Sequence, residues 1–328
     1  MSTTIRQRVG AALALMVFPL ATFAADERTC TMRDAALPTN SITYVLCEEG
    51  LLLVTNNEGA TWAQRKIPDI NGLRALAFAD ENRGLAIGVG GLIVATADAG
   101  RTWQKRPQVT TENLTDIQMV GDEGWIAGFD GVILHTADGG KTWAKQETGV
   151  TLSLETLYFL DAQNGWAAGW AGLVLHTVDG GNKWQVVKVP GASWSLTSIA
   201  FRDAKNGWIS GFAGQLFRTK DGGATWEAKT APYAGWLTSI AFDGANRGWI
   251  TTDDGFLMST DAGETWKSQR QPTETQFFLN KLLRGNGSVW ALGPFGMVKQ
   301  TGTGVDWKRI ANPLSANADI EEAKSQRF

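Results

Sequence analysis

Short runs of apolar residues, separated by Gly, Asn and Asp, follow one another along most of the chain and predict β-strands joined by tight turns. The runs come in sets that repeat. A set opens with a segment such as LTSIAF (196–201), continues with a mark such as KNGWISG (205–211) and closes with an octet such as TKDGGATW (219–226). No helix-length segment of 3.6-residue period lies between the glycines, so the pattern excludes a helical solenoid.

The closing octet recurs seven times at a nearly constant interval. Its consecutive tryptophans are 40 to 42 residues apart, and a spacing that regular indicates one structural module per period. Four short strands fit within each period, and a repeated four-stranded meander is typical of a β-propeller. The sequence therefore predicts an all-β fold, a seven-bladed β-propeller of four-stranded antiparallel blades over residues 41–312. The octets end at Trp62, Trp103, Trp143, Trp184, Trp226, Trp266 and Trp307.

The first module lacks a clear innermost strand. In the third module we expect strands A to D at 114–120, 125–128, 132–136 and 142–146, whereas the first module shows only strands B to D. Either residues 25–40 or the C-terminal tail could supply the missing strand. We favour 25–40, because a bond between Cys30 and Cys47 would fasten that segment to strand B. Residues 313–328 are polar and charged, so we expect a flexible tail there.

The N-terminus has the layout of a signal peptide over residues 1–24. Arg6 and Arg8 precede an apolar run at 9–23 and a small-residue stretch, and the first acid is Asp26. The run is shorter than the roughly 20 residues that cross a bilayer, and no second run of that length follows. We expect cleavage after Ala24, and a monomeric mature protein that does not span the membrane and is periplasmic or secreted.

Composition narrows the classes of partner and cofactor. The formal net charge of −3 does not favour nucleic acid as a partner. Cys30 and Cys47 are the only cysteines; outside the cytoplasm they can form a disulfide, and two buried free thiols are the alternative. The two histidines take the same position in consecutive modules, so we predict no metal site and no cofactor.

The octet T-x-D-x-G-x-T-W has a structural explanation. Its Asp can accept backbone N–H groups within the turn, its Gly permits a positive φ, and its Trp can pack between neighbouring sheets. The carboxylates therefore need no catalytic role to account for them. They are Asp98, Asp138, Asp179, Asp221 and Asp261.

These octets resemble the Asp-box, also called the bacterial neuraminidase repeat. With the N-G-W-x-x-G mark and the period of about 41 residues, they resemble the photosystem II stability/assembly factor family over residues 41–312. The resemblance implies a propeller without a catalytic centre that binds newly made or partly assembled membrane proteins. The arginines here form no repeat-matched row like the arginine-lined surface of photosynthetic members. The resemblance is therefore to a non-photosynthetic, periplasmic relative, whose expected partner is an envelope protein such as an exporter of the resistance-nodulation-division type.

Topology favours one face of the ring for binding. In a four-stranded meander the octets share a face with the turns between strands A and B. The loops between strands B and C and between modules share the other face, which we call the loop face. We predict that its apolar side chains bind an apolar or aromatic-rich segment of a membrane or envelope protein, or a lipid-like ligand; the alternative is that they fill the channel wall. They are Val89, Phe129, Trp170, Phe212 and Phe295 after strand B, and Trp194, Tyr233 and Trp236 between modules.

Two other classes of function stay open. A carbohydrate-binding propeller would use Trp170, Trp194 and Trp236 as stacking platforms. A glycoside hydrolase would need two carboxylates, and a sialidase-like enzyme a tyrosine nucleophile. No pair of acids stands out by spacing, so the sequence favours a non-enzymatic scaffold. The acids on or near the loop face are Glu112, Asp116, Glu155, Asp253 and Asp254.

Overall fold

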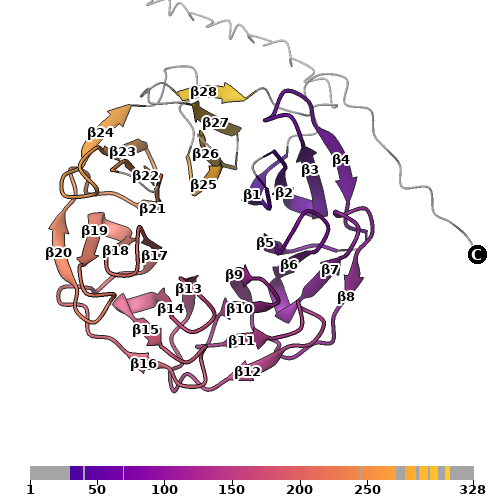
Figure 1. The fold of residues 1–328 in the computed structure, drawn as a ribbon, viewed down its shortest axis with the longest axis horizontal. Helices are drawn as coiled ribbons and strands as arrows, with labels where there is room; N and C mark the ends of the chain where they lie inside the picture. The colour runs from indigo at the N-terminus through magenta and orange to yellow at the C-terminus, as the bar shows by residue number, and fades with distance from the viewer. Residues whose placement is uncertain are drawn as a thin grey trace, which may run out of the picture.

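Seven four-stranded antiparallel sheets stand side by side in a ring around a central channel (Figure 1). The computed structural model describes residues 30–39, 41–68, 70–243, 246–270, 278–285, 288–294, 296–301 and 307–310. Within these ranges the only helical segments are short 3₁₀ turns between the second and third strands of a blade. The predicted all-β, seven-bladed propeller is confirmed. The expected signal peptide, the tail at 313–328 and Phe295 lie outside the described residues.

Each blade takes four consecutive strands, the first at the channel and the fourth at the outer edge (Figure 1). We number the blades one to seven in chain order. The strands are β1 (Met32–Ala36), β2 (Thr43–Cys47), β3 (Leu51–Thr55) and β4 (Ala63–Lys66) in blade one; β5 (Leu73–Phe78), β6 (Gly84–Gly88), β7 (Ile93–Thr96) and β8 (Gln104–Lys105) in blade two; β9 (Leu114–Val120), β10 (Glu123–Gly128), β11 (Ile133–Thr136) and β12 (Ala144–Gln146) in blade three; β13 (Leu154–Phe159), β14 (Gly165–Gly169), β15 (Val174–Thr177) and β16 (Gln185–Val186) in blade four; β17 (Leu196–Phe201), β18 (Gly207–Gly211), β19 (Gln215–Thr219) and β20 (Glu227–Thr230) in blade five; β21 (Leu237–Phe242), β22 (Gly248–Thr252), β23 (Gly255–Ser259) and β24 (Lys267–Arg270) in blade six; and β25 (Lys281–Gly285), β26 (Ser288–Gly293), β27 (Gly296–Thr301) and β28 (Trp307–Ile310) in blade seven. The 3₁₀ turns are η1 (Glu48–Gly50), η2 (Val89–Gly91), η3 (Trp170–Gly172) and η4 (Phe212–Gly214).

The second strand of a blade is buried because neighbouring sheets cover both of its faces. β14 and β18 are buried at every position, whereas the outer strands β8 and β16 are short and exposed. A wide, flat side chain suits the gap between two sheets. Four second strands place a fully buried tryptophan there, namely Trp125, Trp166, Trp208 and Trp249. In the part of the chain that the structure describes, no helix is long and apolar enough to cross a membrane.

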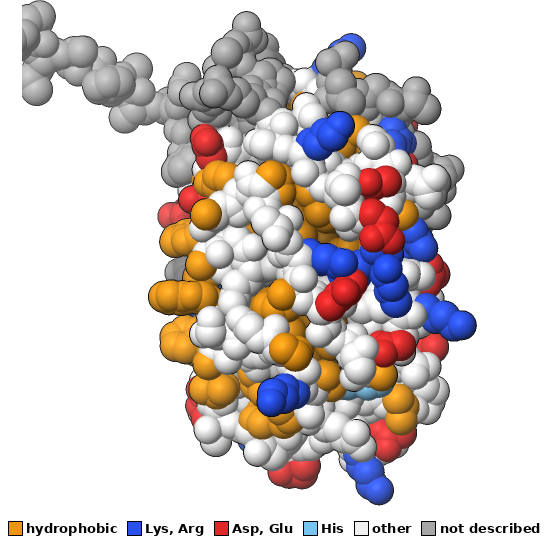
Figure 2. Space-filling view, turned by 90° about the vertical axis from the view of Figure 1, so that its left-hand side faces the viewer, with side chains coloured by type: hydrophobic (Ala, Val, Ile, Leu, Met, Phe, Trp, Pro, Cys, Tyr) orange, Lys and Arg blue, Asp and Glu red, His pale blue; other side chains and the backbone are white. Residues whose placement is uncertain are grey.

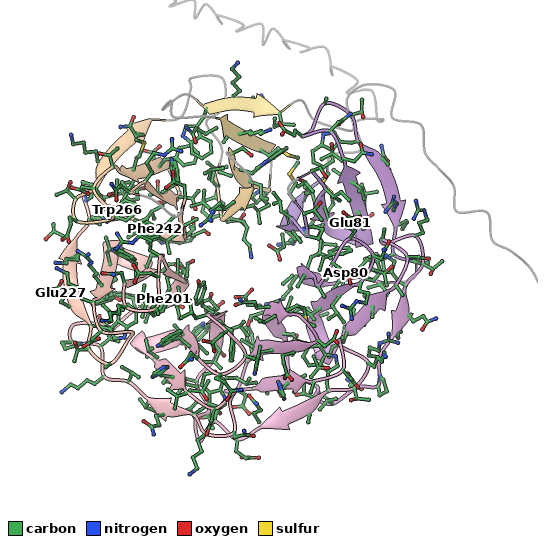
Figure 3. All side chains as sticks on the ribbon, viewed as in Figure 1. Asp80, Glu81, Phe201, Glu227, Phe242 and Trp266 are labelled. Atoms are coloured by element: carbon green, nitrogen blue, oxygen red, sulfur yellow. A yellow bond between two sulfur atoms is a disulfide. The ribbon has the colours of Figure 1, made fainter. Side chains whose placement is uncertain are left out.

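An aromatic trio joins each of three neighbouring blade pairs. Trp208 of blade five packs on Phe242 in the first strand of blade six, with 4.2 Å between ring centroids. Phe242 in turn meets the octet residue Trp266 edge-on at 5.9 Å, and Figure 3 shows these two side chains within the wall of the ring. The octet tryptophan therefore packs between two sheets. The two preceding blade pairs have the trios Trp125, Phe159, Trp184 and Trp166, Phe201, Trp226.

The octet turns of blades two to six are each held by their own side chains. In blade three, Thr142 donates its backbone N–H to Asp138 Oδ1 over 2.9 Å and its hydroxyl to Asp138 Oδ2 over 2.6 Å. These hydrogen bonds hold the pKa of Asp138 well below its usual range. Asp179 keeps the backbone bond, from the N–H of Lys183, but has no threonine hydroxyl to accept, because Lys183 stands where the octets of blades two, three, five and six have threonine. Both contacts recur at Asp98, Asp221 and Asp261.

The glycine at the fifth position of an octet brings its blade against the one before it. Gly223 of blade five has a φ of +84°, and a Cβ built on it would lie 2.4 Å from Trp166 Nε1 of blade four. Gly263 of blade six, with a φ of +80°, stands in the same relation to Trp208 at 2.7 Å. Only glycine fits, because any side chain would strain the backbone and collide with the ring. The octets therefore fasten neighbouring blades as well as closing turns.

Blade one takes its channel strand from the N-terminal segment. β1 pairs antiparallel with β2, and a disulfide joins Cys30 to Cys47, whose Cα atoms are 5.3 Å apart. β25 to β28 form blade seven without a strand from the N-terminus. The first and last blades therefore share no strand among the described residues, and the ring must be closed by other contacts.

Side chains close the seam between blades seven and one. Met32 of blade one shares a hydrophobic cluster with Trp290 of blade seven. Lys299 Nζ of blade seven lies 2.6 Å from Glu58 Oε2 of blade one, and the backbone N–H of Met32 donates to the carbonyl oxygen of Pro294 over 3.2 Å. Apolar packing, ion pairing and a backbone hydrogen bond thus hold the two ends of the ring together.

Candidate functional site

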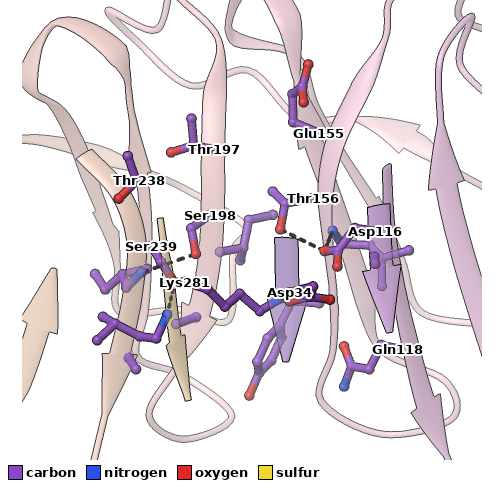
Figure 4. Close-up of a pocket in the computed structure, with 18 of the residues that line it drawn as sticks. Asp34, Asp116, Gln118, Glu155, Thr156, Thr197, Ser198, Thr238, Ser239 and Lys281 are labelled. Carbon is purple, nitrogen blue, oxygen red and sulfur yellow. Dashed lines mark hydrogen bonds and ion pairs between the residues drawn. The ribbon is translucent and has the colours of Figure 1, made fainter. Parts of the chain in front are cut away.

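The first strands of the blades line a polar cavity of about 470 Å³ in the channel (Figure 4). The third residue of five of these strands is polar, and in blade seven Lys281, the first residue of β25, also lines the cavity. Figure 4 shows these side chains around the cavity: Asp34, Asp116, Thr156, Ser198, Ser239 and Lys281. Their contacts decide whether the cavity is a reaction site or a structural brace.

Most of these polar groups brace neighbouring blades. Asp34 Oδ2 accepts the backbone N–H of Leu76 over 2.8 Å, and Asp116 Oδ2 accepts that of Leu157 over 2.9 Å. In each case a side chain of one blade satisfies a backbone donor of the next, which a buried donor requires. Two further pairs follow the pattern, Ser198 with Ile240 and Ser239 with Leu282.

Lys281 of blade seven reaches across the seam to blade one. Its Nζ lies 3.0 Å from Asp34 Oδ1, and Figure 4 shows Asp116 on the same side of the cavity as Asp34. Burial alone would lower the pKa of Lys281, but the charges of Asp34 and Asp116 raise it above its usual range, so the amine is charged at neutral pH. Burial raises the pKa of Asp116, against the effect of Lys281. These charges contribute to closing the ring.

The loop after the second strand is tied to the start of its own blade in four successive modules. Trp170 donates its backbone N–H to the carbonyl oxygen of Ser153, and the other three make the equivalent bond. Val89, Phe129, Trp170 and Phe212 therefore occupy one repeat position on the loop face. Their exposure differs: Trp170 is 51% and Val89 40% exposed, while Phe129 and Phe212 are partly buried. The guanidinium of Arg74 lies 5.4 Å from the centre of the Phe129 ring and covers it.

Exposed tryptophans gather over blades four to six. Trp194 is 58% and Trp236 48% exposed. The loop of Trp170 is tied to that of Trp194, because Gly172 N–H donates to the Trp194 carbonyl oxygen over 2.9 Å, and Phe212 stacks on Trp236 at 4.8 Å. We call Trp170, Trp194, Phe212 and Trp236 the tryptophan rim. Figure 2 shows hydrophobic side chains along one edge of the ring and charged ones toward the other.

Carboxylates adjoin the tryptophan rim. Trp170 Nε1 donates to Glu155 Oε1. Asp253 Oδ1 accepts the hydroxyl of Tyr233 over 2.7 Å and the backbone N–H of Trp236 over 3.0 Å. Burial and the adjacent Asp253 raise the pKa of Tyr233 to about 12, so its phenol stays protonated at neutral pH.

The groups that an enzyme would need have other partners. The hydroxyls of Tyr44 and Tyr158 donate to backbone carbonyl oxygens. Asp116 braces blade four, and Glu155 holds Trp170. Glu112 lies in the loop between β8 and β9, and Asp254 in the turn between β22 and β23, so the two acids belong to different blades. No group of three or more His, Cys, Asp or Glu among the described residues could hold a metal ion.

Sequence reasoning missed how the rim is supported. It did not connect Glu155 with Trp170, or Asp253 with Tyr233, and it did not include Phe278, whose ring meets Trp236 edge-on at 6.3 Å. A signal for Glu155 was present. It stands second in strand A, where the other blades have Arg, Thr or Asn.

One protein family matches the chain. The model of the Photosynthesis system II assembly factor YCF48 family matches residues 56–155 and 182–277, which is more than half of the chain. No curated protein matches it.

Several solved structures share the fold. "YCF48 bound to D1 peptide" superposes with a TM-score of 0.71 at 20% identity, covering 84% of this chain and 94% of that one. YCF48 from Cyanidioschyzon merolae has a TM-score of 0.69 at 18% identity, covering 84% and 96%. An ancestral GH74 enzyme reaches 0.69 at 12% identity, covering 86% of this chain and 46% of its own. At these identities the likeness shows the fold alone.

Proposed function

The chain belongs to the Photosynthesis system II assembly factor YCF48 family, and on that premise we propose that it is a non-enzymatic assembly factor that binds a segment of a membrane-protein client. The tryptophan rim on the loop face is the observation that carries the proposal. Three tryptophans that are each about half exposed and adjoin one another make an apolar surface of the kind that marks a binding site. Tryptophan is also enriched among the residues that dominate binding energy at protein interfaces.

A peptide is the natural occupant of such a surface. One related solved structure is YCF48 bound to D1 peptide, so a propeller of this family can bind a peptide. In this chain the rim runs across three blades, which suits a segment longer than one side chain. We do not assign a photosystem polypeptide, because this chain lacks the repeat-matched arginines.

We place the protein and its client outside the cytoplasm. The signal-peptide layout of the N-terminus and the disulfide between Cys30 and Cys47 both fit an oxidising compartment. The client is then a membrane or envelope complex, and an exporter of the resistance-nodulation-division type is the candidate we test first.

The test removes the rim and follows the client. In the native envelope, chemical crosslinking and mass spectrometry identify the membrane protein that the wild type captures. Changing Trp170, Trp194 and Trp236 together to Ser should reduce its recovery about tenfold or more, since each is a candidate hot spot. The matched control changes Val178 and Val186 to Ser, because both are 64% exposed and lie outside the rim. Unchanged capture by a folded triple variant contradicts the proposal.

A carbohydrate-binding role is the second candidate, because the same three tryptophans could stack on sugar rings. Binding of the wild type to envelope polysaccharides, lost in the triple variant, would favour it. Robust hydrolysis of a glycan would contradict both proposals and favour an enzyme of the GH74 kind.

A further inference from the structure

Three internal sites of this protein combine a tryptophan, a cation over its ring and a carboxylate on the cation. Lys299 Nζ lies 5.0 Å from the centre of the Trp290 ring and 2.6 Å from Glu58. The same triple occurs twice more, as Trp208 with Arg218 and Glu264, and Trp249 with Arg247 and Asp243. The attraction of a cation to the ring face and its ion pair support each other in these triples.

The tryptophan rim has two of these three components, the tryptophan and the carboxylate. Trp170 has a carboxylate on its indole nitrogen in Glu155, and Trp236 has Asp253 at its backbone. In the part of the chain that the structure describes, no Lys or Arg lies over either ring. The missing third part is a cation, and the exposed ring faces leave room for one from outside.

The charges around the rim agree with a cationic occupant. The loops between second and third strands in blades one to six contain Glu48, Glu49, Asp130, Asp253 and Asp254, and no Lys or Arg. Basic groups at the channel mouth are engaged elsewhere: Arg33 pairs with Glu48, and Arg74 covers Phe129. The loops that carry the rim residues contain one basic residue, Lys188, which is exposed in the loop of Trp194. Against this one lysine stand two carboxylates that contact rim residues, Glu155 and Asp253.

A neutral apolar segment would fit this surface less well. It would cover the indole faces but also exclude water from Glu155 and Asp253, and a charge buried without a partner is costly. A guanidinium stacked on a ring can reach the adjacent carboxylate with its N–H groups, as Arg218 does on Trp208 and Glu264.

We propose that the tryptophan rim recognises a client segment in which arginine alternates with apolar residues. The arginines stack on Trp170 and Trp236 and pair with Glu155 and Asp253, while the apolar residues cover Trp194 and Phe212. The inference rests on the proposed function and names the chemistry of the segment that the loop face selects.

The test compares two probes that differ only in charge. One is a short, acetylated and amidated peptide of alternating leucine and arginine; in the other, citrulline, which has the shape of arginine without its charge, replaces each arginine. Calorimetry should show the arginine peptide binding the full-length mature protein about tenfold tighter than the citrulline peptide. Added salt should narrow that difference.

Variants tie the preference to the rim. Glu155→Gln with Asp253→Asn keeps the acceptor oxygens but removes both charges, and should abolish the preference for arginine. Asp80→Asn with Asp122→Asn is the matched control and should keep it; these side chains are 44% and 63% exposed and lie outside the rim. Equal binding of both peptides to the wild type, or no binding of either, overturns the inference. The wild type could instead bind both peptides equally, and the tryptophan-to-serine triple variant bind neither. That result would overturn the preference for arginine but not the proposed function, which is tested by capture of the client.

Discussion

Replacing Gly223 by alanine tests whether the octets fasten neighbouring blades. The added methyl group would lie 2.4 Å from Nε1 and 3.0 Å from Cε2 of Trp166 in the preceding blade. That ring cannot move aside easily. It is 2% exposed and packed between His176 at 4.7 Å and Phe201 at 4.0 Å.

The expected loss has a backbone part and a contact part. Alanine at a positive φ costs about 1 to 2 kcal/mol, of which about 0.4 to 1 is offset by the stiffer unfolded chain. Crowding a packed interior costs a further 1 to 3 kcal/mol, roughly. Gly223→Ala should therefore lower the free energy of unfolding by about 2 to 4 kcal/mol. Gly191 is the matched control: its φ is +87°, yet no atom lies within 4 Å of the added Cβ, so Gly191→Ala should cost about 1 kcal/mol or less.

Urea unfolding followed by tryptophan fluorescence measures both variants against the wild type. The difference between them isolates the contact between blades, since the backbone strain is common to both. Equal destabilisation of the two variants would refute the reasoning, because the octet would then close its own turn without bracing the preceding blade.

Three further changes probe other parts of the ring. Removing the disulfide by Cys30→Ala with Cys47→Ala should lower the free energy of unfolding by about 3 kcal/mol, as chain entropy predicts for a loop of this length; the same urea midpoint for reduced and oxidised wild type would argue against it. Hydrogen bonds from Thr265 lower the pKa of Asp261 to about 2 from an ordinary 3.8. The ionised carboxylate therefore stabilises the folded state fully above about pH 4, and this stabilisation is lost as pH falls toward 2. Asp261→Asn should thus melt below the wild type at pH 7, with a gap in Tm that closes on acidification; a constant gap contradicts this. Lys281→Met leaves Asp34 buried without its cation and should lower the free energy of unfolding by about 2 kcal/mol. That is less than the loss of a fully buried pair, because Lys281 is 34% exposed; a variant as stable as the wild type in urea would show that this ion pair does not stabilise the ring.

The fold could be predicted from the repeat because each module contains the residues that form its own turns and pack it against a neighbouring blade. The octet closes a turn with Asp138 and Thr142, and its glycine packs against the preceding blade, so local sequence and global architecture agree. One repeat position was explained only by the structure. The residue opposite each second-strand tryptophan is His135, His176, Arg218, Met258 or Lys299, and all five pair in register with the ring-bearing residue. The histidines are stacking residues there.

The binding surface could be located from the sequence but its shape could not. Phe129 and Trp170 share one repeat position, yet Arg74 from the preceding blade covers the first, while the second is half exposed. Exposure depends on neighbours distant in the chain, such as Arg74, which is 55 residues from Phe129, and periodicity does not report them. The pair of Lys281 with Asp34 is equally invisible, because it joins the two ends of the ring.

Site-specific photocrosslinking in the native envelope tests the central claim most directly. A photoreactive phenylalanine analogue replaces Trp194 on the rim or, in the control, Val178, which is 64% exposed beside an octet on the opposite face. The account predicts an adduct with an integral membrane protein from position 194 and none from position 178. An adduct from position 178 alone, or from neither position, would contradict it.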